Sequence, residues 1–161
     1  MAWNISILTT TGTKEVVDKI IPDIFYKAKE SLHFEDATSC SIDKNLTIGY
    51  YQNQIIIIDV LGRLVNDEKF AIQVSLQKDE SKIFWISESP IYRQYKNGTK
   101  IYDINGKQQI SNRLKELALV PVDEWGETMI FQLFDFEVFK EKRNDYGMLI
   151  SNINFDLYEL G

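Results

Sequence analysis

The sequence has very few of the residues that build disulfides and transition-metal sites. Its 161 residues include one cysteine, Cys40, and one histidine, His33. A single cysteine excludes an internal disulfide, and the two counts together exclude zinc sites built on several cysteine or histidine ligands. Sites made of carboxylates alone, which would suit magnesium or calcium, remain compatible with the composition. Because no motif points to one, we expect neither a metal nor a cofactor.

Long apolar runs and an excess of positive charge are also absent. No stretch approaches the ~18 consecutive apolar residues of a membrane span, and residues 1–8 lack the basic region of a secretory signal. The chain has 18 Lys plus Arg against 24 Asp plus Glu, a net charge of -6, which argues against duplex nucleic acid or an anionic membrane as partner. We therefore expect a cytoplasmic protein. Its many Ile, Lys and Asn residues suggest a bacterial origin.

What the chain does contain is the composition of a globular protein. Hydrophobic residues make up 44% and charged residues 26% of the sequence, which is normal for a folded domain. A chain of this length can bury about 70% of the surface that it exposes when unfolded. There is no internal repeat, low-complexity segment or long linker, so we expect one domain over residues 1–161.

The first 44 residues indicate a strand followed by a helix. The first ten residues, which include the apolar residues Ile5, Ile7 and Leu8, predict the strand, and Thr13 is a plausible helix N-cap. Apolar residues at spacings of three and four then predict a helix, and the helical pattern continues to Leu32. At Pro22 either this helix kinks or two short helices meet. A loop is expected over residues 33–44.

The middle of the chain has the periodicity of strands. Residues 46–51 and 55–60 predict a hairpin, and the run Ile55–Ile58 has no polar face, as in a strand buried on both sides. Residues 70–76 alternate and predict a hairpin with 83–86. The turn Asn97-Gly98 predicts a third hairpin between 91–96 and 99–104. Six consecutive strands of this kind would form an antiparallel meander.

The last third returns to helical spacing. One helix is expected around residues 110–117 and ends before Pro121, and a second begins at Val122 or Asp123 and runs to about Lys142. A closing strand follows over residues 149–157. The predicted fold class is therefore α+β: an antiparallel sheet of six or seven strands with one N-terminal and two C-terminal helices packed on it.

Candidate catalytic residues are few and isolated. Asp59 follows a buried strand, where enzymes often place a carboxylate, but no second ligand accompanies it. Glu88, Tyr92 and Arg93 gather polar groups around a Ser-Pro turn. These four residues could line a polar pocket over the sheet, although each also has an ordinary structural explanation. His33 and Cys40 lack the third group that a cysteine nucleophile requires.

Charge is polarised along the sequence. Residues 82–115 carry seven basic and two acidic residues, a net charge of +5, whereas residues 116–161 carry three basic and ten acidic residues, a net charge of -7. If the two segments lie on different surfaces, the acidic one would steer a basic partner toward the protein. If they pack together, they neutralise each other.

The acidic segment also contains an unusually apolar helix. Residues 129–139 would place apolar side chains on all sides of a helix. This helix is either buried in the domain beneath the N-terminal helix, or covered by a second copy or another protein. In the second case the interface would contain five residues, namely Glu124, Trp125, Glu127, Glu137 and Glu141.

These features favour a non-catalytic protein-binding module. An acidic protein that masks a basic partner, as toxin-neutralising immunity proteins do, fits the charge and the absence of catalytic motifs, although this is an analogy of class. The alternative is a small-molecule-binding protein or small hydrolase that uses the pocket of Asp59, Glu88, Tyr92 and Arg93.

Overall fold

The protein is built on one antiparallel sheet of eight strands. The structure is a computed structural model that describes residues 5–21, 25–38, 45–60, 67–140 and 150–160. The spatial order of the strands is β2-β8-β3-β4-β1-β5-β6-β7, and all neighbouring strands are antiparallel. The strands are β1 (Ile5–Thr11), β2 (Phe25–Leu32), β3 (Leu46–Tyr51), β4 (Gln54–Asp59), β5 (Glu80–Ile86), β6 (Ile91–Lys96), β7 (Thr99–Asn105) and β8 (Phe155–Leu160).

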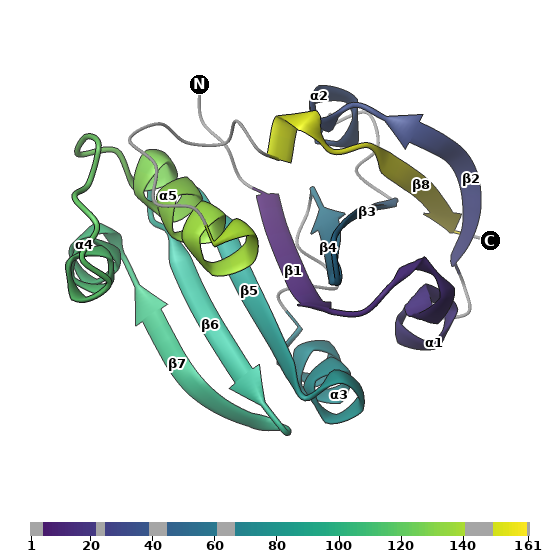
Figure 1. Cartoon of the computed structure of the whole chain (residues 1–161), viewed down its shortest axis with the longest axis horizontal. Helices are drawn as coiled ribbons and strands as arrows, with labels where there is room; N and C mark the ends of the chain where they lie inside the picture. The colour runs from purple at the N-terminus through teal and green to yellow at the C-terminus, as the bar shows by residue number, and fades with distance from the viewer. Residues whose placement is uncertain (1–4, 22–24, 39–44, 61–66, 141–149, 161) are drawn as a thin grey trace.

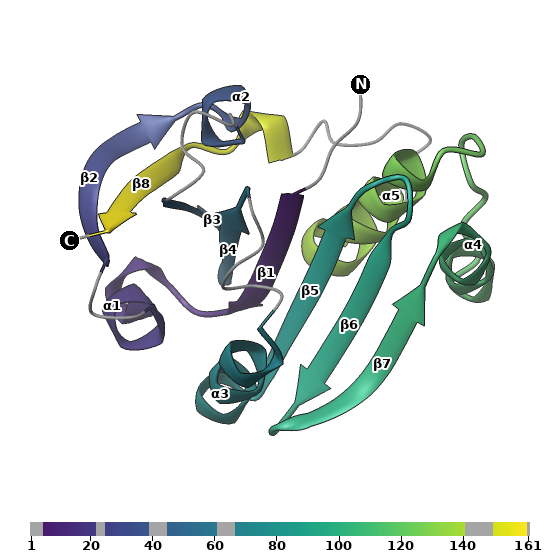
Figure 2. The ribbon, with the colours of Figure 1, turned by 180° about the vertical axis from the view of Figure 1, so that it is seen from behind.

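Helices cover both faces of this sheet. They are α1 (Val17–Ile20), preceded by the 3-10 turn η1 (Lys14–Val16), α2 (Phe34–Ala37), α3 (Glu68–Lys78), α4 (Lys107–Glu116) and α5 (Gly126–Phe139), followed by the 3-10 turn η3 (Ile150–Asn152). Helix α5 lies in front of β5 in Figure 1 and behind it in Figure 2. Within the described residues, no helix is both long enough and apolar enough to cross a membrane.

The isoleucine run of β4 divides the core into two halves. Ile56 and Ile58 point to the face covered by α2, α4 and α5, which we call the α5 side. Ile55 and Ile57 point to the face covered by α1 and α3, the α3 side. All four are essentially inaccessible, because successive residues of a strand point to opposite faces. The prediction that this strand is buried on both sides is confirmed.

Two of the three predicted hairpins are confirmed. β3 pairs with β4, and β6 pairs with β7. In the turn between β6 and β7, Asn97 and Gly98 have φ of 48° and 83°, the positive values that a type I′ turn requires. The predicted six-strand meander is wrong, because β1 lies between β4 and β5, and β8 lies between β2 and β3.

Two elements have the opposite secondary structure from the predicted one. Residues 25–32, predicted as helix, form the edge strand β2, where long-range pairing with β8 decides the conformation. Residues 70–76, predicted as a strand, belong to helix α3, whose N-cap Asp67 accepts a hydrogen bond from the Lys69 backbone N–H at 3.0 Å. Ala71, Val74 and Ser75 are its buried face, at the spacing of a helix.

The C-terminal elements lie close to their predicted places. The helix predicted around residues 110–117 is α4, and α5 begins at Gly126 rather than at Val122 or Asp123. A Cβ atom at position 126 would overlap the Glu88 backbone carbonyl, so the glycine allows α5 to approach the turn between β5 and β6. The closing strand β8 covers Phe155–Leu160, later than predicted.

Candidate interaction surface

The connection between α4 and α5 carries three exposed apolar side chains. In this segment, residues 117–125, which we call the α4–α5 loop, Val120 is 80% exposed, Val122 42% and Trp125 63%. Exposing large apolar side chains to water is energetically unfavourable. Clusters of such side chains on a protein surface often mark sites of interaction. The loop is therefore the strongest candidate for a binding surface in the described part of the chain.

Helix α4 ends in a motif that sets the direction of this loop. The Ala118 N–H donates to the Lys115 carbonyl at 3.0 Å, and the Leu119 N–H donates to the Leu114 carbonyl at 2.8 Å. This is the Schellman pattern, with Ala118 at the left-handed position (φ 61°) that glycine usually occupies. Leu114 and Leu119 are both buried, so the loop starts from a fixed point.

The middle of the loop is held by one side chain of α5. The amide of Gln132, which is buried, donates to the Val120 carbonyl at 3.0 Å and accepts from the Val122 N–H at 2.9 Å. These two bonds bracket Pro121, which has no N–H of its own. The backbone is thereby fixed while the side chains of Val120 and Val122 stay in solvent.

The end of the loop is held by Asp123. Its carboxylate accepts from the Trp125 backbone N–H at 2.8 Å and from the Thr128 hydroxyl at 3.1 Å. The negative charge also lies at the N-terminus of α5, where the helix dipole stabilises it. Trp125 is the N-cap residue of α5, and its side chain projects from an ordered backbone.

The body of α5 is buried within the chain. Every residue from Thr128 to Phe139 except Phe136 is buried, and its aromatic rings contact several elements. Phe134 meets Phe84 of β5 with ring centroids 5.0 Å apart, and Phe139 meets Tyr51 of β3 at 4.6 Å. The apolar circumference of this helix is thus used by the sheet, α2 and α4. The N-terminal helix does not cover it, because α1 lies on the α3 side.

The five residues predicted to bind a partner are therefore divided. Glu124 and Trp125 are exposed and Glu127 is half-buried, all at the start of α5. Glu137 is 9% exposed and belongs to the interior, and Glu141 lies outside the described residues. Sequence reasoning missed Val120, Val122 and Gln132. The sequence did contain a signal for the two valines: they flank Pro121 in a connection between helices, where polar residues are expected.

Glu137 is the centre of a buried charge network. Its carboxylate lies 3.1 Å from the Lys82 Nζ and 3.8 Å from Arg113 Nη2, and the Arg113 guanidinium stacks over the Tyr102 ring at 4.5 Å. Burial, together with the negative charge of Glu137, raises the pKa of the neighbouring Tyr92. This network joins α5 and α4 to the sheet, and all its charged groups have partners, which identifies it as structural.

The ion pairs of the basic segment, residues 82–115, run mostly to acids outside the acidic segment, residues 116–161. Among the described residues, five of its seven basic residues form ion pairs. Arg93 pairs with Asp103 at 3.2 Å and Lys107 with Glu88 at 2.6 Å. Lys100 lies 2.8 Å from Glu68 and 3.1 Å from Asp103. From the acidic segment, Glu116 pairs with Arg113, and Glu137 pairs with Lys82 and Arg113.

The residues predicted for the alternative pocket do not converge. Asp59 is fully buried at the end of β4, and Glu88 is exposed in the turn after β5. Tyr92 belongs to the α5-side core and hydrogen-bonds to Gln94. Arg93 lies opposite Ile83, on the α3 side. Adjacent residues of one strand cannot line one pocket over one face.

The described residues offer no group of three or more His, Cys, Asp or Glu side chains that could hold a metal ion. His33 is exposed before α2, and Cys40 lies outside the described residues. Comparison with protein-family models, with curated proteins and with solved structures finds no significant match to this chain.

Proposed function

We propose that this chain is a non-catalytic protein-binding module whose docking surface is the α4–α5 loop with the first turn of α5. One observation carries the proposal: three apolar side chains, Val120, Val122 and Trp125, are exposed on a loop whose backbone is held by hydrogen bonds to the buried side chain of Gln132. Tryptophan is enriched among the residues that dominate binding energy. A loop already held in one conformation also loses little entropy when a partner orders it.

The charge around this surface favours a basic partner. Residues 116–127 contain four acids, Glu116, Asp123, Glu124 and Glu127, and no lysine or arginine. Glu124 is exposed, and Glu116 has a side chain that is 66% exposed and pairs with Arg113 at 3.2 Å. Such a surface attracts a protein with a basic rim around an apolar site. An anionic membrane, the other common target of exposed tryptophan and valine, would repel it.

The narrower proposal is a toxin-neutralising protein of the immunity type. It is supported by charge complementarity, because an acidic surface that is already held in one conformation is suited to covering a basic site on a toxin. A gene for a large secreted toxin directly upstream of this one would support that role. A neighbourhood without any toxin gene would argue for another basic partner.

The small-molecule or hydrolase alternative has less support. Its four residues, Asp59, Glu88, Tyr92 and Arg93, lie at separate places in the fold. A hydrolase would need them, or an equivalent set, around one substrate.

Site-specific photo-crosslinking in the source cell tests the proposal. A crosslinking amino acid at Val120 should give an adduct with one basic protein, whereas the same group at Leu76, which is 62% exposed on α3, should not. With the purified pair, Trp125→Ala should weaken binding at least about tenfold. Glu124→Lys should weaken it and reduce its salt dependence, and Glu35→Lys on α2, an equal change of charge elsewhere, should leave it unchanged. Equal adducts from both positions, or Trp125→Ala binding as well as the parent, would refute the proposal.

A further inference from the structure

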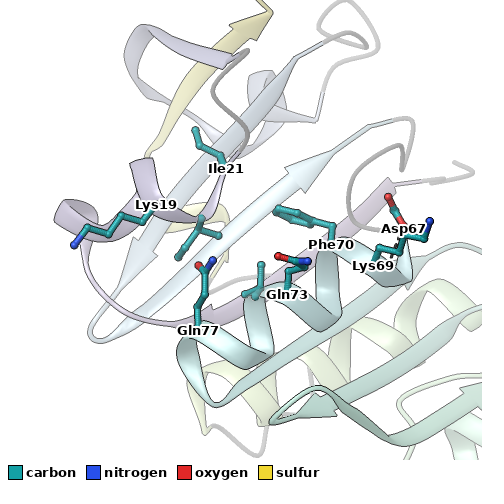
Figure 3. A pocket seen from close by; sticks show the side chains of 9 residues that line it. Lys19, Ile21, Asp67, Lys69, Phe70, Gln73 and Gln77 are labelled. Atoms are coloured by element: carbon teal, nitrogen blue, oxygen red, sulfur yellow. Dashed lines mark hydrogen bonds between the residues drawn. The ribbon is translucent and has the colours of Figure 1, made fainter.

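A second surface feature lies on the opposite face of the sheet. Between α1 and α3 there is an open groove of about 440 Å³, which Figure 3 shows from close by. This volume lies within the range of about 300–1,000 Å³ that is typical of small-ligand sites. The groove is separated from the α4–α5 loop by the sheet, because α1 and α3 pack on the α3 side and α5 on the other.

The groove is lined by the end of α1 and by one side of α3. Helix α1 ends at Ile20, and Ile21 is already extended, with ψ of 151°. Side chains of these two residues and of Val74 on α3 form an apolar floor, each less than 8% exposed. The half-buried ring of Phe70 continues this floor toward the start of α3. An apolar body could therefore lie along α3.

The two ends of the groove carry different charges. Lys19 and Gln77 lie at one end, and Asp67 and Lys69 lie at the other (Figure 3). The Asp67 carboxylate is fixed there because it caps α3 through the Lys69 backbone N–H. Among the lining residues, the Lys19 end thus has a formal charge of +1, whereas the Lys69 end has one charge of each sign.

We propose that this groove binds an amphipathic carboxylate, with its apolar body over Phe70 and Val74 and its carboxylate at the Lys19 end. The Lys19 ammonium, which points away from Gln77 in Figure 3, supplies the positive charge when its flexible side chain turns toward the groove, and the Gln77 amide supplies a hydrogen-bond donor at the same end. The opposite orientation would bring the carboxylate close to Asp67, which repels it. An acyl chain and an aromatic ring system would both fit an apolar floor, so the shared chemistry is an apolar body with one terminal carboxylate.

Titration of the labelled protein with three probes tests this assignment. Decanoate and 1-naphthoate have an acyl and an aromatic body, and decyltrimethylammonium has the same apolar length with a positive charge. Amide chemical shifts should change in α1 and α3 with at least one carboxylate, with a dissociation constant of about 1 mM, the affinity expected for such small ligands. The cation should bind at least about fivefold more weakly. The carboxylate that binds more tightly identifies an acyl or aromatic ligand.

Two lysines of one groove provide a matched pair of variants. Lys19→Glu should weaken carboxylate binding about fivefold or more, whereas Lys69→Glu, the same change of charge at the other end, should have less than half that effect. Gln73→Trp, at an exposed position between the two ends, should fill the groove and abolish binding. The melting temperature of each variant verifies that the fold is retained.

Other results would overturn the assignment. Shift changes away from α1 and α3, no shift changes with either carboxylate at concentrations several times the expected constant, or equal binding of decyltrimethylammonium would each do so. A stronger effect of Lys69→Glu than of Lys19→Glu would reverse the orientation and refute the site as proposed. This inference does not depend on the docking surface, since Trp125→Ala should leave carboxylate binding unchanged.

Discussion

The buried side chain of Gln132 bonds to the backbone on both sides of Pro121, accepting from Val122 and donating to the carbonyl of Val120. Gln132→Leu keeps the size of the side chain and removes both bonds. We expect a loss of about 1–2 kcal/mol in the free energy of unfolding. Urea denaturation measures this loss, and hydrogen exchange should show faster exchange of the Val122 amide.

A matched control for this change is Gln109. Its side-chain oxygen accepts from the Asn105 backbone N–H at 2.8 Å, but at an exposed position. Gln109→Leu should therefore cost less than about 0.5 kcal/mol, because water replaces the lost bond. If Gln132→Leu reduced the free energy of unfolding as little as Gln109→Leu, the two hydrogen bonds of Gln132 would not be what holds the loop.

Ala118 is the one residue of the Schellman motif that does not suit its position. Its φ of 61° is left-handed, and an alanine there is strained by its Cβ atom. Ala118→Gly should therefore stabilise the protein by about 0.5 kcal/mol after the greater entropy of the unfolded glycine chain is included. Ala118→Val should destabilise it by about 1 kcal/mol, since a branched side chain tolerates this conformation least. An order of stability other than Gly, Ala, Val in urea denaturation would contradict this explanation.

Gly126 allows the close contact between α5 and the turn after β5. In most helices, replacing glycine by alanine is stabilising. Here the new Cβ atom would overlap the Glu88 carbonyl oxygen, so Gly126→Ala should cost about 1–3 kcal/mol. Thermal unfolding measures this cost, and a variant as stable as the parent would show that the turn can move away.

The buried pair of Lys82 and Glu137 should be far more important for stability than its exposed counterparts. Glu137→Ala would leave the buried Lys82 ammonium with only Glu80, 3.7 Å away, at a cost of about 3 kcal/mol. The double variant Lys82→Met/Glu137→Leu should recover most of that loss, because the buried ammonium is removed together with its partner. Glu80 keeps its hydrogen bond from Gln94, and Arg113 keeps its ion pair with Glu116.

The exposed pair of Lys107 and Glu88 provides the comparison. It is shorter, at 2.6 Å, but both side chains are almost half exposed. Glu88→Ala should cost less than about 1 kcal/mol. If this variant cost as much as Glu137→Ala in urea denaturation, burial would not be what distinguishes the two pairs.

Much of the fold was predictable where a local signal was sufficient. The sequence Asn97-Gly98 strongly favours a type I′ hairpin turn, and the isoleucine run of β4 strongly favours a strand that is buried on both faces. The prediction was wrong for residues 25–32 and 70–76, because the spacing of their apolar residues is compatible with a helix and with a strand. Pairing with β8 decided the first, and the Asp67 cap with a buried helical face decided the second.

The candidate surface was predictable only in part. The acidic residues and Trp125 at the start of α5 were visible in the sequence as a cluster. The buried place of Glu137 was hidden, although Lys82 shares the alternation of Phe84 and Ile86 and so had to point into the same core. The two hydrogen bonds of Gln132 join it to residues ten and twelve positions away in the sequence, and no local sequence pattern predicts such bonds.

Tyr95 gives a prediction for the dependence of stability on pH. Burial, and the hydrogen bond that its hydroxyl donates to Glu68 at 3.0 Å, raise the pKa of Tyr95 to about 12. In the unfolded chain the pKa of tyrosine is about 10, so above that pH the unfolded state loses its proton first. The contribution of Tyr95 to stability should therefore be constant below about pH 10 and fall as the pH rises toward 12. Urea denaturation across this range measures the fall, and Glu68→Gln should bring the pKa of Tyr95, followed by tyrosinate absorbance, closer to 10, because a neutral amide no longer opposes the phenolate. An unchanged pKa in this variant would mean that burial alone raises it.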